Sequence, residues 1–261
     1  MNQLRKPLNI TIAILVVLGA AIVGSSGFYI DWLWFKSVGF TSVWSTVLTT
    51  KITLFVVVGL ITSLFISANI YLAHRSRPLY VPMTIEADNL ERYRAQIEPI
   101  RRWVFLGIAL VLIYFGGSSG SVFWSTWLQF KNSTPFGQTD PQFGLDISFF
   151  AFKLPMYQAL VAWGISTLVF AIIGSAIVHY LYGGIRPQVA QERTTVAARV
   201  QLSVLLGLVV LLKAGAYWLD RYALALKDNK LITGLTYTDV NALLPAKAIL
   251  TGIALICSLL F

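Results

Sequence analysis

The chain has 261 residues, of which 57% are hydrophobic and only 12% are charged. A soluble domain of this length needs more charge on its water-facing surface, so the composition argues against a soluble protein and indicates one embedded in lipid. The net charge of +9 could indicate a nucleic-acid surface, but the basic residues flank apolar runs in short clusters, as membrane topology determinants do. We therefore expect the lipid bilayer as partner and no nucleic acid.

Long apolar runs predict an all-α, polytopic bundle of about six transmembrane helices. A hydrocarbon core of about 30 Å needs roughly 20 helical residues, and a helix satisfies its backbone hydrogen bonds within the segment. The runs of sufficient length fall near residues 8–30, 52–73, 103–123, 156–182, 200–219 and 246–261. The first run is longer than the apolar part of a secretory signal, so we interpret it as a retained span. The last run is still apolar at Phe261, and we expect the chain to end within or just after a helix.

The arginines predict a cytoplasmic N-terminus in the plasma membrane, because cytoplasmic loops retain positive charge. Lysines lie on both sides and dilute this bias, while Arg221 is the one arginine that falls outside. The predicted cytoplasmic loops are 74–102 and 183–199, and the predicted extracytoplasmic loops are 31–51, 124–155 and 220–245. Trp and Phe are frequent in the first two extracytoplasmic loops, as in segments at the headgroup level, and we expect these loops to cap the bundle.

Chemistry within a membrane requires ionisable groups away from water, and few lie in the predicted spans. Lys213 is the clearest, about 20 Å along the fifth helix from Val200, where its amine can reach the outer headgroups by snorkelling. An alternative hypothesis pairs Lys213 with Asp220, two turns further on the same face, as a site for an anion or a proton. Most other carboxylates fall in predicted loops, so no acid relay crosses the bilayer and a proton-coupled pump is disfavoured.

Small residues predict where the helices pack closely. Gly24 and Gly27 lie at the end of the first span, and Gly116 and Gly120 lie four residues apart in the third. Such positions leave strips without side-chain bulk, along which a neighbouring helix can approach. We interpret these four glycines as helix-packing residues.

The remaining residues predict no enzyme, no cofactor and no metal site. His74 and His179 lie near the inner ends of spans, where a haem between two helices is an alternative, but interfacial histidines beside basic loops are ordinary. Cys257 lies in an apolar run and is interpreted as a small core residue. The chain has no Gly-rich phosphate loop, no His-Glu-x-x-His helix and no Gly-x-Ser-x-Gly turn.

Several motifs spread over the chain carry a resemblance to a known family. They include Asp31-Trp32-Leu33-Trp34-Phe35, Asp140-Pro141-Gln142-Phe143-Gly144, the segment 179–186, the segment 217–222 and the segment 236–242. Together they resemble uncharacterised protein family 0182, which comprises large multi-pass membrane proteins found chiefly in actinobacteria. The resemblance implies no established activity or catalytic residue. It implies that further membrane sequence and a large extracytoplasmic region follow, and that this chain is the N-terminal membrane part.

These observations together predict a membrane domain that anchors or assembles a larger cell-envelope protein. Its outer loops would pack against an envelope partner or the protein's own C-terminal region. A transporter or channel with a polar site at Lys213 is the alternative, in which the glycine-rich helix ends allow rocking. An intramembrane enzyme would need a buried acid, thiol or metal site, which the spans do not contain.

Overall fold

The computed structural model describes residues 5–78, 91–92, 95–187, 193–228 and 234–261. Parts of the predicted loops 74–102, 183–199 and 220–245 therefore lie outside the described residues. Within the described ranges every regular element is a helix, and the only strand-like pairing consists of two isolated bridges. The structure confirms the all-α prediction.

The chain divides into two compact units, residues 1–52 and 53–261. The first contains helix α1 (Arg5–Ser37) and the beginning of α2 (Thr41–Arg75), which are joined by a turn with Gly39 at φ 78°. The predicted extracytoplasmic loop 31–51 is therefore helical except for this short turn. Apolar residues predict only the part of a helix that lies in lipid. The helix itself can continue into water, because its backbone hydrogen bonds form there too.

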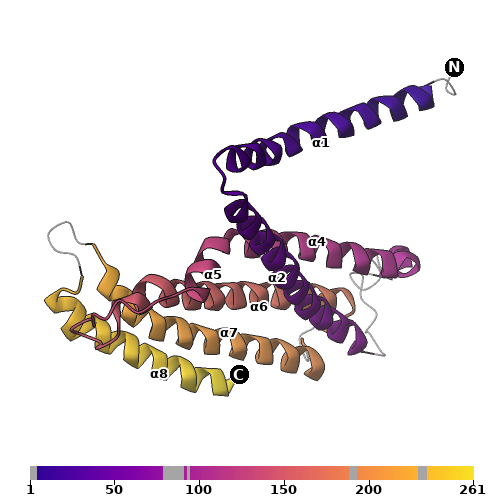
Figure 1. Ribbon diagram of the computed structural model, residues 1–261. Helices are drawn as coiled ribbons and strands as arrows, with labels where there is room; N and C mark the ends of the chain where they lie inside the picture. The colour runs from indigo at the N-terminus through magenta and orange to yellow at the C-terminus, as the bar shows by residue number, and fades with distance from the viewer. Residues whose placement is uncertain (1–4, 79–90, 93–94, 188–192, 229–233) are drawn as a thin grey trace. The chain divides into compact units, whose positions relative to one another are not determined.

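The second unit holds the rest of α2 and the remaining helices of the described chain. These are α4 (Arg101–Val122), α5 (Trp124–Lys131), α6 (Leu154–Leu181), α7 (Val196–Ala223) and α8 (Leu244–Leu260). Helix α7 packs between α6 and α8, and α4 packs against α2 (Figure 1). The arginine end of this unit is where α2 and α6 end and α4 and α7 begin. The aromatic end is where α4 and α7 end and α6 and α8 begin.

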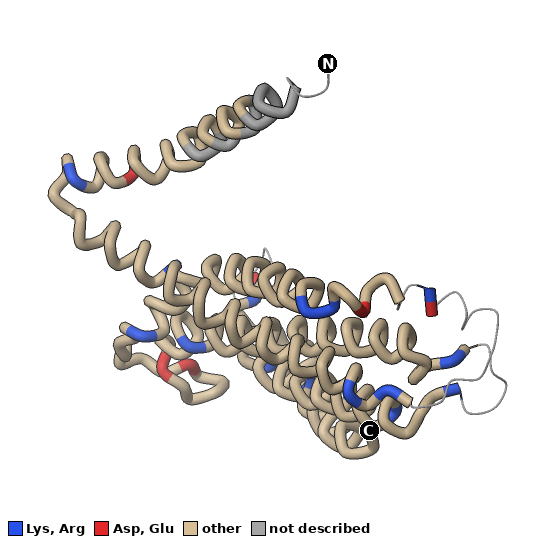
Figure 2. Tube along the Cα trace, turned by 90° about the vertical axis from the view of Figure 1, so that its right-hand side faces the viewer, with Lys and Arg blue, Asp and Glu red and all other residues tan. Residues whose placement is uncertain are grey.

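Five helices in the described part of the chain are long and apolar enough to cross a membrane. Their bounds are Thr41–Arg75, Ala95–Val122, Phe149–Leu181, Val196–Leu226 and Asp239–Leu260. Charged residues are sparse along the middle of these helices and lie mostly toward their ends (Figure 2). The remaining predicted span, 8–30, lies in α1, where several side chains fall outside the described residues. The protein is a membrane-embedded helical bundle.

The contact between α2 and α4 is formed by backbone as well as by side chains. A Cβ added at Gly59 would lie 2.6 Å from the carbonyl oxygen of Ile113, and one added at Gly117 would lie 2.6 Å from that of Phe55. The hydroxyl of Ser63 also donates to the carbonyl oxygen of Ala109, at 2.9 Å. Glycines allow this approach because they have no side chain, and close backbone contact is a main source of helix association in lipid.

A small apolar core joins four helices of the second unit. It consists of Ile66 on α2, Leu168 and Ala171 on α6 and Leu205 on α7, each at most 6% exposed, with Leu112 of α4 packed against them. Lipid tails are as apolar as these side chains, so the contact derives its stability from close packing rather than from exclusion of water. Large apolar side chains elsewhere on the helices are exposed, as expected for a surface that faces lipid.

Helices α6 and α8 begin in the same way at the aromatic end. Each follows a five-residue π-helical turn, Phe149–Lys153 before α6 and Asp239–Leu243 before α8, and each has a proline in its first turn. Proline lacks a backbone N–H, so it leaves no unpaired donor at the start of a helix. Leu154 and Leu244, the first residues of the two helices, are both buried.

Candidate functional site

Lys213 and Asp220, the predicted intramembrane polar site, have different partners. The Lys213 side chain is exposed on α7, and its amine lies 5.2 Å from the ring centre of Tyr217, one turn toward the aromatic end. Asp220 accepts a hydrogen bond from the amine of Lys247 on α8, at 3.1 Å. In the described part of the chain, the two residues do not form an ion pair. The Lys213 side chain extends toward the aromatic end of α7, as expected for a lysine that snorkels to the membrane surface.

A second ion pair at the aromatic end is buried on one side. Asp239, only 1% exposed, accepts from the amine of Lys227 at 3.0 Å and from the backbone N–H and hydroxyl of Thr236 at 2.9 and 2.7 Å. These contacts hold the chain that leads into α8. Because both carboxylate oxygens are engaged by the protein itself, Asp239 has a structural role in this arrangement.

The segment between α5 and α6 is folded around two more carboxylates. Asp146 accepts from the backbone N–H groups of Phe136, Gly137 and Ser148, at 3.1, 2.9 and 2.8 Å. These bonds, with the hydroxyl of Ser148 contributing most, lower the pKa of Asp146 from 3.8 to about 2. Asp140 accepts in the same way from the N–H groups of the two residues at 142 and 143. The predicted outer loop is an ordered structure at this point.

Aromatic rings fix this segment to the bundle. Tyr222 of α7 lies 4.9 Å from Phe143 and 5.4 Å from Phe149, measured between ring centres, and 6.5 Å from Phe150. Phe150 is only 4% exposed. Edge-to-face and tilted contacts of this kind add to the stability gained from burial. The aromatic end is therefore closed by its own side chains.

His179 lies in a buried polar network that links three helices. Its Nε2 is 2.9 Å from the side-chain oxygen of Gln201 on α7, and since an amide oxygen can only accept, His179 donates. The amide nitrogen of Gln201 donates in turn to the backbone oxygen of Asn69 on α2, at 2.9 Å, and to the hydroxyl of Ser175, at 3.2 Å. Hydrogen bonds between helices in lipid contribute about 0.6 kcal/mol each on average. We interpret the network as a link between α2, α6 and α7.

The glycine after α6 keeps this histidine in place. A Cβ at Gly184 would lie 2.8 Å from the Nδ1 of His179, so a larger residue would displace the imidazole. His74, the other predicted interfacial histidine, makes an edge-to-face contact with the ring of Tyr182, with ring centres 4.8 Å apart. The two imidazoles thus have separate partners rather than a shared ligand position. Among the described residues, no group of three or more metal-ligating side chains comes together.

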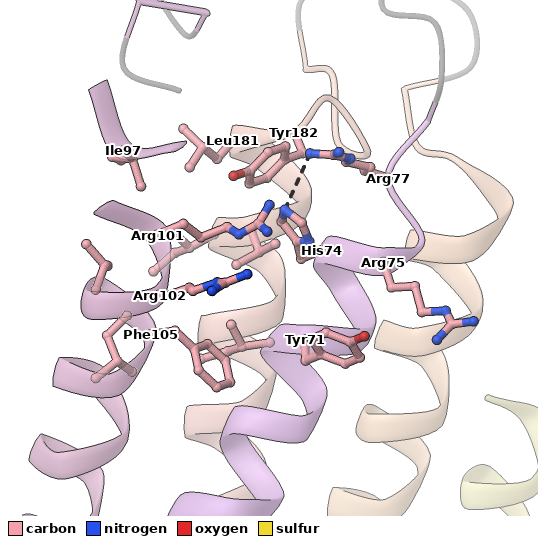
Figure 3. Close-up of a pocket in the computed structure, with 15 residues that line it drawn as sticks. Tyr71, His74, Arg75, Arg77, Ile97, Arg101, Arg102, Phe105, Leu181 and Tyr182 are labelled. Carbon is pink, nitrogen blue, oxygen red and sulfur yellow. Dashed lines mark hydrogen bonds between the residues drawn. The ribbon is translucent and has the colours of Figure 1, made fainter. Parts of the chain in front are cut away.

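A cavity of about 800 Å³ lies at the arginine end, between α2, α4 and α6 (Figure 3). Its deeper walls are apolar. They are formed by Ile70 and Tyr71 of α2, Val104, Phe105 and Ile108 of α4, and Ile177 and Val178 of α6. Its mouth is basic and includes Arg75, Arg77, Arg101 and Arg102 together with His74. The cavity thus has an apolar interior and a positively charged entrance.

The arginines at the mouth differ in direction. Figure 3 shows Arg77, Arg101 and Arg102 turned toward the space between the helices, whereas Arg75 points away from it. Arg77 lies over the ring of Tyr182, at 5.6 Å, and its guanidinium is 3.4 Å from the Nε2 of His74. Arg101 pairs with Glu98 at 2.6 Å. For Arg102 the described part of the chain contains no ion-pair partner.

Tyr182 forms the buried side of this mouth and is 8% exposed. Its hydroxyl donates to Glu98 at 3.5 Å, a long hydrogen bond. Burial, followed by the negative charge of Glu98, raises the pKa of Tyr182. The phenol therefore stays protonated at neutral pH and remains a hydrogen-bond donor beside the arginines.

The packing glycines predicted from sequence occupy two kinds of position. A Cβ at Gly116 would lie 2.9 Å from the Cβ of Thr62, and one at Gly120 would lie 2.5 Å from the Cβ of Val58, so both face α2. At Gly24 and Gly27 an added Cβ would meet no atom within 4 Å. For these two the packing role stays a prediction.

Sequence reasoning did not find the cavity, although a signal for it was present. The arginine pairs at 75 and 77 and at 101 and 102 were interpreted only as topology determinants. Both pairs adjoin span ends on the same side, which is the condition for basic side chains to meet at one interface. The sequence alone does not tell which of these ends are neighbours.

Comparison with known proteins supports the resemblance of the motifs. The sequence profile described as uncharacterised protein family UPF0182 matches residues 8–261. The chain belongs to this family. It is 49% identical to a UPF0182 protein of Streptomyces coelicolor, 46% to one of Nocardioides sp. and 45% to one of Thermobifida fusca.

These alignments cover 98%, 100% and 95% of the chain, but only 26%, 26% and 24% of the three relatives. The chain thus spans about a quarter of the length of the curated UPF0182 relatives it matches. No solved structure matches it.

Proposed function

We propose that this chain is the membrane domain of a larger cell-envelope protein, and that its aromatic end anchors and assembles an extracytoplasmic region or an envelope partner. The observation that carries the proposal is the segment 132–148, which is folded around Asp146 and is held against the bundle by the contact of Phe143 with Tyr222. An ordered platform at a helix end is suited to docking because little conformational entropy remains to be lost on binding.

Exposed aromatic side chains at this end supply the contact surface. Phe136 is 51% exposed and Tyr237 is 84% exposed, while their backbone neighbourhoods are fixed by Asp146 and Asp239. Exposed aromatic side chains on a rigid support are frequent anchors of protein interfaces. The length of the relatives provides a second line of support, because three quarters of each lies outside the matched segment.

The proposal includes an orientation in the plasma membrane. The arginine end faces the cytoplasm and the aromatic end faces outward, in accordance with the positive-inside rule. Ser76 lies at the arginine end and is exposed, and Ser133 lies at the aromatic end and is partly exposed. In a Cys257→Ser background, a membrane-impermeant maleimide should label a cysteine at 133 in intact cells and should label one at 76 only after lysis. The reverse pattern would contradict the orientation.

The docking role is tested by cross-linking in the full-length protein. A photoreactive amino acid at position 136 or 237 should capture an extracytoplasmic segment or an envelope protein, whereas the same group at Trp103, which is 74% exposed at the arginine end, should not. Deletion of residues 130–152 should abolish capture from position 237 while the protein remains in the carbonate-resistant membrane fraction. Equal capture from position 103, or capture that survives the deletion, would reject the proposal.

The transporter alternative would require Lys213 to line a polar path through the bundle. In the structure the Lys213 side chain is exposed on α7 and its amine lies over Tyr217. Several hydroxyl and amide groups inside the bundle are engaged in contacts between helices, such as those of Thr62 with Trp163 and of Gln201 with Asn69. These observations favour anchoring.

A further inference from the structure

The cavity at the arginine end extends from the end of the helices toward the middle of the membrane. On α2, Ile70 lies one turn deeper than His74, and on α4, Phe105 and Ile108 lie one and two turns deeper than Arg101. On α6, Ile177 lies one turn deeper than Leu181. The polar groups therefore occupy the mouth and the apolar groups the deeper part. This order follows the polarity of a phospholipid, whose headgroup lies at the interface and whose acyl chains lie below it.

Among the described residues, the positive charge at the mouth is only partly balanced. The one carboxylate that contacts the mouth residues in the described part of the chain is that of Glu98, which pairs with Arg101 and is half-exposed. Arg77 is held by a ring and an imidazole, neither of which neutralises it. Arg102 turns toward the same space without an ion-pair partner among the described residues. Collecting like charges is unfavourable, so an anion at the mouth would stabilise it.

The side chains at the mouth match one kind of anion. A guanidinium group presents N–H donors in a planar fork that fits two oxygens of a phosphate group. The buried hydroxyl of Tyr182 and the ring nitrogens of His74 lie beside these forks (Figure 3). Arginine pockets between transmembrane helices near the membrane surface recognise phospholipid headgroups by this chemistry.

We propose that this cavity binds a phospholipid with an anionic headgroup, its phosphate held by Arg77, Arg101 and Arg102 and one acyl chain lying against the apolar walls of α2, α4 and α6. A free phosphate ion would satisfy the guanidinium groups but would leave the apolar part of a cavity of about 800 Å³ unfilled. In the proposed orientation the site opens in the cytoplasmic leaflet, where anionic lipids create a negative surface potential. The lipid site itself does not depend on the anchoring role.

The test is a lipid titration of the full-length protein in detergent, followed by native mass spectrometry. Phosphatidylglycerol should bind at least about tenfold more tightly than phosphatidylcholine with the same acyl chains. Both lipids carry the phosphate, but only phosphatidylcholine brings a cationic trimethylammonium group to the arginines, and like charges at this distance repel. Arg102→Gln should weaken phosphatidylglycerol binding about tenfold by removing one such contact. Equal binding of the two lipids would overturn the proposal.

Arg199→Gln is the matched control, because it removes the same charge from the same end of the bundle, at an exposed position of α7 that does not line the cavity. It should leave the affinity for phosphatidylglycerol nearly unchanged. A loss as large as that of Arg102→Gln would show a general effect of surface charge and would reject the site. Glycerol phosphate and inorganic phosphate should fail to displace the lipid at equal concentration, and displacement by either would identify an anion site in place of a lipid site.

A measurement on the unsubstituted protein keeps the proposal testable if Arg102→Gln fails to fold. Phosphatidylglycerol with a photoreactive group near its headgroup should cross-link to peptides that contain residues 97–108 or 177–182. An excess of unlabelled phosphatidylglycerol should suppress this product, and an excess of phosphatidylcholine should not. Cross-links confined to segment 132–148 or to α8 would overturn the proposal. This result is independent of capture at positions 136 and 237, so failure of the lipid site and failure of the anchoring role are distinguishable.

Discussion

The two ends of the bundle use charged residues in opposite ways. At the aromatic end Asp220 pairs with Lys247 and Asp239 pairs with Lys227, and the backbone satisfies Asp146. At the arginine end guanidinium groups gather around a cavity in which Glu98 is the one contacting carboxylate of the described chain. Charges that neutralise one another hold a structure together, whereas charges left without a counterion attract a ligand. The difference agrees with a structural role for one end and with the proposed lipid site at the other.

The largest expected effect tests whether both ends belong to one packed bundle. In Gly120→Leu the new side chain would begin 2.5 Å from the Cβ of Val58, so α4 must move away from α2. Overpacking of this kind typically destabilises by about 1–3 kcal/mol, and the apparent melting temperature in detergent should fall clearly. Lipid binding at the arginine end should weaken as well, because α2 and α4 both line the cavity.

Gly107→Leu is the control for this substitution. Gly107 lies on the same helix, but an added Cβ there would meet no atom within 4 Å. Its melting temperature should stay close to that of the native protein. Equal losses for Gly120→Leu and Gly107→Leu would contradict the close contact of α2 and α4.

Substitutions in the two ion pairs at the aromatic end should lower the melting temperature by less, and by different amounts for the two pairs. Asp239→Asn replaces a buried acceptor of three hydrogen bonds by an amide with one oxygen, so either Lys227 or Thr236 loses its partner. Asp220→Asn affects a partly exposed pair, which is worth about 0–1 kcal/mol. The melting temperature should therefore fall further for Asp239→Asn, and the opposite order would refute the structural role given to Asp239.

The smallest expected effect is a change in the stability of segment 132–148 on substitution of Asp146, and its pH dependence appears only at acidic pH. The pKa of Asp146 in the folded protein is about 2, below its ordinary value of 3.8. Ionised Asp146 therefore stabilises segment 132–148 above pH 3.8, and this contribution is lost as the pH falls from 3.8 to about 2. Pepsin should cleave the segment faster in Asp146→Asn than in the native protein near pH 4, and the ratio of the two rates should approach one near pH 2. A ratio that does not change with pH would exclude the proposed role of the carboxylate.

The helical class of the molecule could be predicted because it depends on chain length and solvent alone. An apolar run such as 156–182 can hardly be anything but a helix in lipid, and Phe149–Leu181 is one of the five helices long enough to span. The helices of the structure continue beyond the apolar runs from which the spans were predicted. Residues 31–51 show this, since their polar and aromatic content indicated a loop and they are mostly helical.

The contacts of charged residues could not be predicted, because they depend on which helices are neighbours. Asp220 was considered with Lys213 on its own helix, yet its partner is Lys247, 27 residues further along the chain on α8. The cavity poses the same problem, since its walls come from three separate segments. Periodicity in one segment defines a face of a helix but does not identify the helix that this face meets.

The backbone contact between α2 and α4 has a mechanical consequence for the cavity. Gly59 meets the carbonyl oxygen of Ile113, and Gly117 meets the carbonyl oxygen and the ring of Phe55, so the two helices touch through backbone atoms. A shift of α2 relative to α4 would break this contact, so we expect the cavity walls that they supply to keep their spacing. Any adjustment to a bulkier or a slimmer occupant has to come from a displacement of α6.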